Sequence, residues 1–176
     1  MAAPRARGCA VADGGARYTA IMQWNEIIEP ATRIGLAFVL GAAIGIERRA
    51  KNHPAGFRTM TLICVGAAGF VLIGIEGLAK ANAAPDAVSR ILQGLMTGIG
   101  FLGAGSIVRD RGNVHGLTTA SAVWVVAAIG AACGLGLFPL AVLLAAVALF
   151  ALLVLGFVER KVDRRKAGEP TDAPGP

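Results

Sequence analysis

The chain has 176 residues, of which 55% are hydrophobic and only 16% are charged. A soluble domain typically carries ~25% charged residues, so this composition excludes an ordinary water-soluble globule. The formal net charge is +6, but the basic residues flank apolar stretches, which favours membrane orientation over nucleic-acid binding. No charged residue occurs over 91–108 or 117–158. We therefore expect helices that satisfy their own backbone hydrogen bonds inside a bilayer.

The N-terminal part of the chain precedes any membrane-spanning run. Residues 1–20 contain arginine, glycine and alanine without a long apolar core, and we expect a disordered tail there. Apolar residues over 21–28, including Trp24, then recur at the spacing of one helical face. This pattern predicts a short interfacial segment that ends before Pro30, with the indole at headgroup level.

Five apolar runs follow and predict five membrane-spanning helices. They cover about residues 31–47, 60–79, 91–108, 117–137 and, after Pro139, 140–158. A loop with Pro54 and Gly56 separates the first two helices, and a tight basic turn over 109–116 separates the third from the fourth. The expected fold class is an all-α polytopic membrane protein, with one transmembrane domain over 21–158. A charged tail over 159–176 is expected to be disordered.

The distribution of basic residues predicts the orientation. With five spans, the first loop, the third loop and the C-terminus share one side of the membrane, and this side holds 11 of the 17 Lys and Arg residues. Positively charged loops remain in the cytosol. We therefore expect the N-terminus outside and the C-terminus inside a bacterial inner membrane.

Glycine spacing predicts close helix packing. Glycines four residues apart, or on the same helix as such a pair, are Gly41, Gly45, Gly94, Gly98, Gly103, Gly130 and Gly134. Small residues allow helix backbones to approach closely in lipid. We expect the first, third and fourth helices at the centre of the bundle, with Gly98 at a tight interface, and the fifth helix facing lipid. Packing without any ligand or partner is the alternative explanation of these pairs.

Polar residues gather at the expected cytosolic ends of the helices. The candidate cluster consists of Glu47, Arg48, Arg58, Thr59, Arg109, Thr118 and Thr119. In a bundle these groups converge on one face, where we expect Glu47 to pair with Arg58 and the threonines to cap a helix or contact a headgroup or ion. Anchoring by positive charge, together with helix capping, is the alternative.

Three further polar residues lie within or beside the spans. Gln93 and Thr97 are four residues apart and share one helix face. Glu76 lies near the end of the second span, and an ionisable group inside a membrane is a candidate functional residue. Because it is close to the surface, its side chain can instead reach the headgroups.

The sequence contains little that indicates catalysis. It has no His-x-x-x-His pair, no Cys cluster at metal-binding spacing and no paired carboxylates, so we expect neither an enzyme nor a bound cofactor. Metal ligands remain unassigned. Gly98, Gly100 and Gly103 form a Gly-x-Gly-x-x-Gly pattern within an apolar helix that no strand precedes, which is not a nucleotide-binding fingerprint.

Two segments resemble the signatures of the MgtC/SapB family of membrane proteins. The first segment comprises Gly45-Ile46-Glu47-Arg48 and Ala55-Gly56-Phe57-Arg58-Thr59. The second segment comprises GIGFLGAG over 98–105, Ser106 to Arg109, Val114, Gly116 to Ala120 and Trp124. Just upstream of it, Ser89 to Ile91 and Gln93 also fit the second signature. The resemblance covers about residues 31–158. Many members continue into a soluble C-terminal domain, so the resemblance implies a short form that consists of the membrane domain.

The resemblance implies an inner-membrane protein linked to growth in low magnesium. The function expected from it is that of a non-enzymatic regulator or accessory factor in Mg²⁺ homeostasis. Its expected partners are the lipid bilayer and other membrane proteins, in a homo-oligomer or hetero-complex, and no nucleic acid. The alternative is a small cation transporter or channel for Mg²⁺ that acts as an oligomer. Mg²⁺ favours carboxylates with retained water, and the membrane domain offers Glu47 and Glu76 near its two surfaces.

Overall fold

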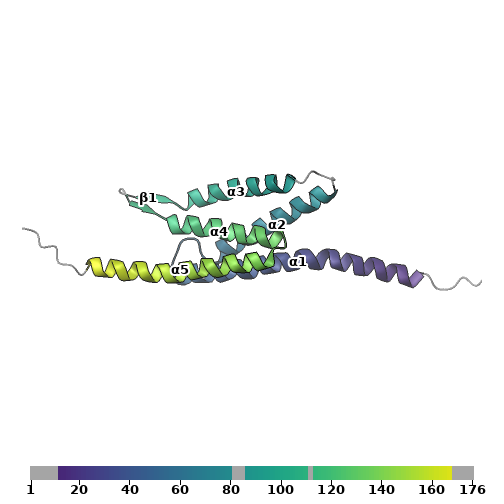
Figure 1. Ribbon diagram of the computed structural model, residues 1–176, viewed down its shortest axis with the longest axis horizontal. Coiled ribbons are helices and arrows are strands. Elements are labelled where there is room, and N and C mark those ends of the chain that lie inside the picture. Colours follow the sequence, from purple (N-terminus) through teal and green to yellow (C-terminus); the bar gives the residue numbers. More distant parts are fainter. Residues whose placement is uncertain (1–11, 81–85, 111–112, 168–176) are drawn as a thin grey trace, which may run out of the picture.

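The structure, a computed structural model, describes residues 12–80, 86–110 and 113–167 of the chain. The described elements are α1 (Ala12–Ala50), α2 (Phe57–Lys80), α3 (Ala87–Gly105), β1 (Val108–Asp110), β2 (Asn113–His115), α4 (Leu117–Gly134) and α5 (Phe138–Ala167). The helices run along the long axis of the molecule, and α4 lies between α3 and α5 (Figure 1). The all-α fold class and the five helices predicted from the sequence are confirmed.

Most of the helices are long and apolar enough to cross a membrane. Four segments meet this condition among the described residues: Ile27–Ala50, Phe57–Leu78, Ala87–Gly105 and Leu117–Gly134. The described apolar part of α5, Phe138–Val154, is shorter; at 1.5 Å per residue it measures about 26 Å. Large apolar side chains cover the outside of the bundle, and Phe101 is 80% exposed. Such a surface suits lipid and not water.

α1 is a single long helix that passes through Pro30. Residues 12–20 are therefore helical, where the sequence predicted a disordered tail, and the expected interfacial segment belongs to the same helix; residues 1–11 lie outside the described ranges. Pro30 has no backbone N–H to donate. The residues before and after it nevertheless continue the helix, because each further residue adds one backbone hydrogen bond. Side chains also bond across this turn: Thr32 Oγ1 donates to the Glu29 carbonyl at 2.8 Å, and Arg33 pairs with the Glu29 carboxylate.

Two other segments differ from the sequence prediction. The expected tight turn over 109–116 contains an antiparallel hairpin, in which Val108 faces His115 and Arg109 faces Val114. In addition, α5 continues to Ala167, so residues 159–167 extend the helix into the tail that was expected to be disordered. Charged residues such as Glu, Arg and Lys are good helix formers, which favours this continuation. Residues 168–176 lie outside the described ranges.

α4 is the central helix, and it packs against α1, α2, α3 and α5. Eleven of its 18 residues are buried, including Thr119, Val126 and Gly134. α3 has only Ile99 and Gly103 buried, so the prediction that the third helix lies at the centre is wrong. α2 occupies that place and packs on both α1 and α4. Because lipid is as apolar as leucine, nothing forces the apolar faces of α3 into the bundle.

Two glycines with positive φ shape the ends of α4. Gly136 (φ 76°) follows the helix, with the Gly136 N–H donating to the Cys133 carbonyl and the Leu137 N–H to that of Ala132, the pattern of a Schellman motif. Arg33 Nη1 donates to the Gly134 carbonyl at 2.7 Å, so a cation from α1 satisfies the helix C-terminus. At the other end, Gly116 (φ 91°) comes so close to Ser106 that an added Cβ would lie 2.0 Å from its carbonyl oxygen.

Candidate functional site

α1 ends on the side of the bundle that carries the α1–α2 loop and the hairpin (Figure 1). A cluster of charged side chains lies at this end of the helix. Its position follows from helix periodicity. Ala37, Gly41 and Ile44 form the buried stripe of α1, and Arg48 is the next residue on that stripe, four positions after Ile44. The guanidinium therefore enters the bundle, and the Arg48 residue is only 2% exposed.

Arg48 binds α4 through a buried hydrogen bond. Its Nη2 donates to Thr119 Oγ1 at 2.9 Å, and Thr119 is also 2% exposed. The Thr119 hydroxyl is available to accept this bond because it does not cap α4: Gly116 is the N-cap residue, and no side chain forms a cap hydrogen bond there. The expected capping by a threonine is therefore not the role of Thr119. This bond connects residues 71 positions apart in the sequence.

Glu47 and Lys51 form the second part of the cluster. Lys51 Nζ lies 2.6 Å from Glu47 Oε1 and directs its hydrogen bond to the Leu152 carbonyl of α5 at 2.8 Å. The lysine thus connects the end of α1 to α5. Glu47 pairs with Lys51 and not, as the sequence predicted, with Arg58, which is exposed on α2.

Several buried polar atoms of the cluster lack hydrogen bonds. Within the described part of the chain, both carboxylate oxygens of Glu47 and the Nε of Arg48 are buried and accept or donate none. The Lys51 contact with Glu47 is therefore electrostatic in character. A buried charge without its full set of hydrogen bonds is costly, and such groups in native proteins are usually explained by function or by bound water or ions. The cluster is accordingly the strongest candidate site for polar chemistry in this bundle.

The other members of the predicted cluster are not brought into this site. Arg58, Thr59, Arg109 and Thr118 are exposed. They lie on the same end of the bundle, at the start of α2, on β1 and at the start of α4. We therefore divide the predicted cluster into a buried core of Glu47, Arg48 and Thr119 and a basic and hydroxyl-bearing surface around it. That surface suits contact with lipid headgroups.

The three polar residues predicted elsewhere in the spans are exposed. Glu76 lies near the end of α2, on the outside of the bundle. Gln93 and Thr97 lie on one face of α3, where the Thr97 hydroxyl donates to the Gln93 carbonyl at 2.9 Å. The Gln93 amide itself faces outward, which is an unfavourable position for a polar group in hydrocarbon unless a partner covers it.

The predicted packing glycines fall into two groups. The glycines of α1 and α4 contact α2 closely. A Cβ added to Gly45 would lie 2.7 Å from Phe57 Cα, and one added to Gly41 would be equally close to α2. A Cβ added to Gly130 would lie 2.2 Å from the Cys64 carbonyl oxygen, and one added to Gly134 would lie 2.7 Å from the Ala68 carbonyl oxygen. Gly103 makes ordinary contacts with α4. An added Cβ at Gly94 or Gly98 meets nothing within 4 Å in the described chain, so the tight interface predicted at Gly98 is not present within one chain.

Two residues of functional interest were missed by the sequence reasoning. Lys51 follows Glu47 by four positions, the helical spacing that favours an ion pair, so a signal for it existed. Arg33 bonds a backbone carbonyl 101 positions away, and no sequence pattern indicates such a contact. Among the residues that the structure describes, no three His, Cys, Asp or Glu side chains gather as a metal site.

Comparison of the sequence with known proteins finds a family and several relatives that resemble this chain. The MgtC family matches residues 34–161. The chain is 39% identical over 156 residues to Protein MgtC of Brucella abortus, which covers 86% of this chain and 63% of that protein. It is 40% identical over 128 residues to Protein MgtC of Salmonella typhimurium (73% and 53%).

A third relative is Protein SrpB of Synechococcus elongatus, 44% identical over 117 residues, which cover 61% of this chain and 64% of that protein. The chain thus spans about half to two-thirds of the length of the curated relatives it matches. No solved structure matches it.

Proposed function

Because the chain belongs to the MgtC family, we propose that it is a non-enzymatic regulator or accessory factor of the bacterial inner membrane, linked to magnesium homeostasis. Its apolar helices and their lipid-compatible surface support a membrane location. The distribution of basic residues supports an orientation with the N-terminus outside. The resemblance to the MgtC/SapB signatures supports the link to magnesium.

The observation that carries the regulatory role is the uncovered outer face of α3. Gly94 and Gly98 have open space above them, and Gln93 and Thr97 on the neighbouring positions are exposed. Small residues allow another backbone to approach closely, and a Gln amide in lipid is stabilised by bonding across helices. The face therefore has the two properties that a partner helix requires. We propose that another membrane protein or a second copy packs here.

A matched pair of glycine variants tests this role. Gly98→Leu blocks the face of α3, whereas Gly66→Leu adds the same side chain at an exposed α2 position that also has nothing within 4 Å. In cells, we expect site-specific crosslinks from position 97 to a membrane protein to disappear in Gly98→Leu and to persist in Gly66→Leu. Growth of a deletion strain in low magnesium should fail with Gly98→Leu alone. Equal behaviour of the two variants would contradict the proposal.

A cation transporter is the competing function. Glu47 and Glu76 lie near opposite ends of the antiparallel α1–α2 pair, so a single chain does not place them in one Mg²⁺ site. We expect purified, folded protein in liposomes containing a Mg²⁺ dye to show no flux, beside a transporter that works as the control. A Mg²⁺ flux that Glu47→Gln or Glu76→Gln abolishes would refute the regulatory role and show that the protein is a transporter.

A further inference from the structure

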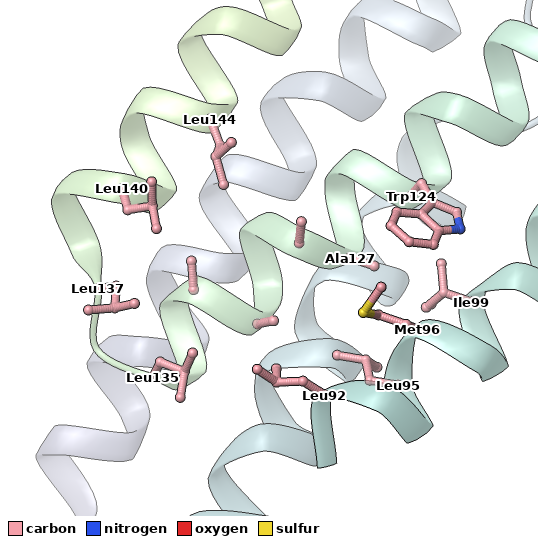
Figure 2. A pocket seen from close by; sticks show the side chains of 13 residues that line it. Leu92, Leu95, Met96, Ile99, Trp124, Ala127, Leu135, Leu137, Leu140 and Leu144 are labelled. Carbon is pink, nitrogen blue, oxygen red and sulfur yellow. The ribbon is translucent and has the colours of Figure 1, made fainter. Parts of the chain in front are cut away.

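A groove of about 290 Å³ lies between α3, α4 and α5. Leu95 and Ile99 of α3 form one wall, Leu140 and Leu144 of α5 form the other, and alanines of α4 form the floor (Figure 2). Ala128 is one of these lining alanines. The lining residues of α3 lie on the side turned away from Gln93 and Gly94. The groove is therefore separate from the face that we assign to a partner helix.

The groove extends over one half of the bundle. Along α4 it reaches from Trp124 to Leu135, near the turn to α5, a rise of about 16 Å at 1.5 Å per residue. Half of the ~30 Å hydrocarbon core of a bilayer is about 15 Å. The groove thus matches the depth of a single leaflet, on the side of the α4–α5 turn.

The volume and lining suit a hydrocarbon chain. Cavities of about 150 Å³ accept benzene, so a groove of twice that volume accepts about a dozen carbon atoms. Every lining side chain is apolar apart from the indole N–H of Trp124. A transmembrane helix needs the full ~30 Å of the core, about twice the length of this groove along α4. The groove is also continuous with the lipid-facing surface, where Trp124 is 45% exposed.

We propose that the groove between α3, α4 and α5 binds one acyl chain of a phospholipid from the leaflet at the α4–α5 turn. Entry of the chain gains no hydrophobic energy, because the bilayer is equally apolar. The stabilisation comes from dispersion contacts with three helices at once, which an unfilled groove would forfeit. The bound chain fills the space between α3 and α5 and holds α3 in place beside α4.

A matched pair of alanine variants tests the proposal. Ala128→Leu fills the floor of the groove, and Ala146→Leu makes the same exchange at an exposed position of α5 outside it. Both residue types are strong helix formers. After purification in mild detergent, we expect the wild type and Ala146→Leu to retain about one phospholipid per chain, by native mass spectrometry, and Ala128→Leu to lose it. Equal retention or equal loss in the two variants would overturn the proposal.

A second measurement leaves the groove unaltered. In a Trp24→Phe variant, Trp124 is the remaining tryptophan of the chain, and brominated acyl chains quench an indole that they contact. After vesicles with brominated phosphatidylcholine are fused with excess unbrominated vesicles, we expect part of the quenching to persist. Recovery of the Trp124 fluorescence to the level expected for the diluted brominated lipid would mean that the groove makes only ordinary, exchanging lipid contacts, and it would refute a bound chain. Dissociation of a dimer by Ala128→Leu, without a change in lipid content, would refute it in favour of a helix from a second copy.

Discussion

The exchange Thr119→Val isolates the buried bond between Arg48 and α4. Valine has nearly the shape of threonine, so the exchange removes the hydroxyl that accepts from Arg48 Nη2 at 2.9 Å and creates no large cavity. Both residues are 2% exposed, and water therefore has little access to replace the lost acceptor. The guanidinium would remain buried, with its Nε already lacking a partner.

The expected cost follows from the charge of the donor. Hydrogen bonds to charged groups contribute about 1.5–3 kcal/mol, and an unpaired buried donor costs its desolvation energy in full. We expect Thr119→Val to lower the free energy of unfolding by about 2 kcal/mol. For a chain of this size such a loss corresponds to a decrease of about 4–8 °C in Tm.

The neighbouring residue supplies the control. Thr118 is exposed in the same turn of α4, so Thr118→Val should leave Tm within about 1 °C of the wild type. Both variants are measured by thermal unfolding in one detergent, with size-exclusion chromatography as the readout. A decrease in Tm that is the same for the two variants would refute the reasoning. In a double-mutant cycle, Arg48→Met should remove most of the effect of Thr119→Val, because no unpaired charge then remains.

Three further predictions concern glycines and the buried carboxylate. Gly130→Ala should lower Tm strongly, because the new Cβ would lie 2.2 Å from the Cys64 carbonyl oxygen. Gly98→Ala has open space and should leave Tm unchanged or raise it, as alanine favours a helix by about 0.8–1.0 kcal/mol; a loss equal to that of Gly130→Ala would contradict the structure. Glu47→Gln should abolish growth of the deletion strain in low magnesium while Asp86→Asn, at an exposed position whose side chain makes no cap hydrogen bond, supports it. Normal growth with Glu47→Gln would leave the cluster a role in anchoring alone.

The candidate site was predicted in part. The end of α1 was identified because charged residues at the border of an apolar run are conspicuous in any membrane sequence. Which of these residues are buried was not identified, since Arg48 and Arg58 look alike in the sequence and differ only by the face on which they lie. Lys51 was overlooked although its spacing from Glu47 indicated a pair.

The glycine pattern shows the same limit. Gly41 and Gly45, Gly94 and Gly98, and Gly130 and Gly134 have identical spacing, and all three pairs were expected at interfaces within the bundle. The pairs on α1 and α4 are tight against α2, whereas the pair on α3 faces open space. Spacing shows that a helix can be approached closely, but it does not show which helix approaches it.

The sequence by itself determined that this is a helical membrane protein and approximately where its helices lie. Those properties are local, because an apolar run of sufficient length must form its backbone hydrogen bonds internally once it is in lipid. Only the tertiary structure decided that α4 is central, that α3 is peripheral and that Arg48 meets Thr119. In a bilayer the hydrophobic effect does not distinguish one apolar helix face from another. The arrangement is therefore decided by the fit of side chains between helices, which composition and periodicity do not record.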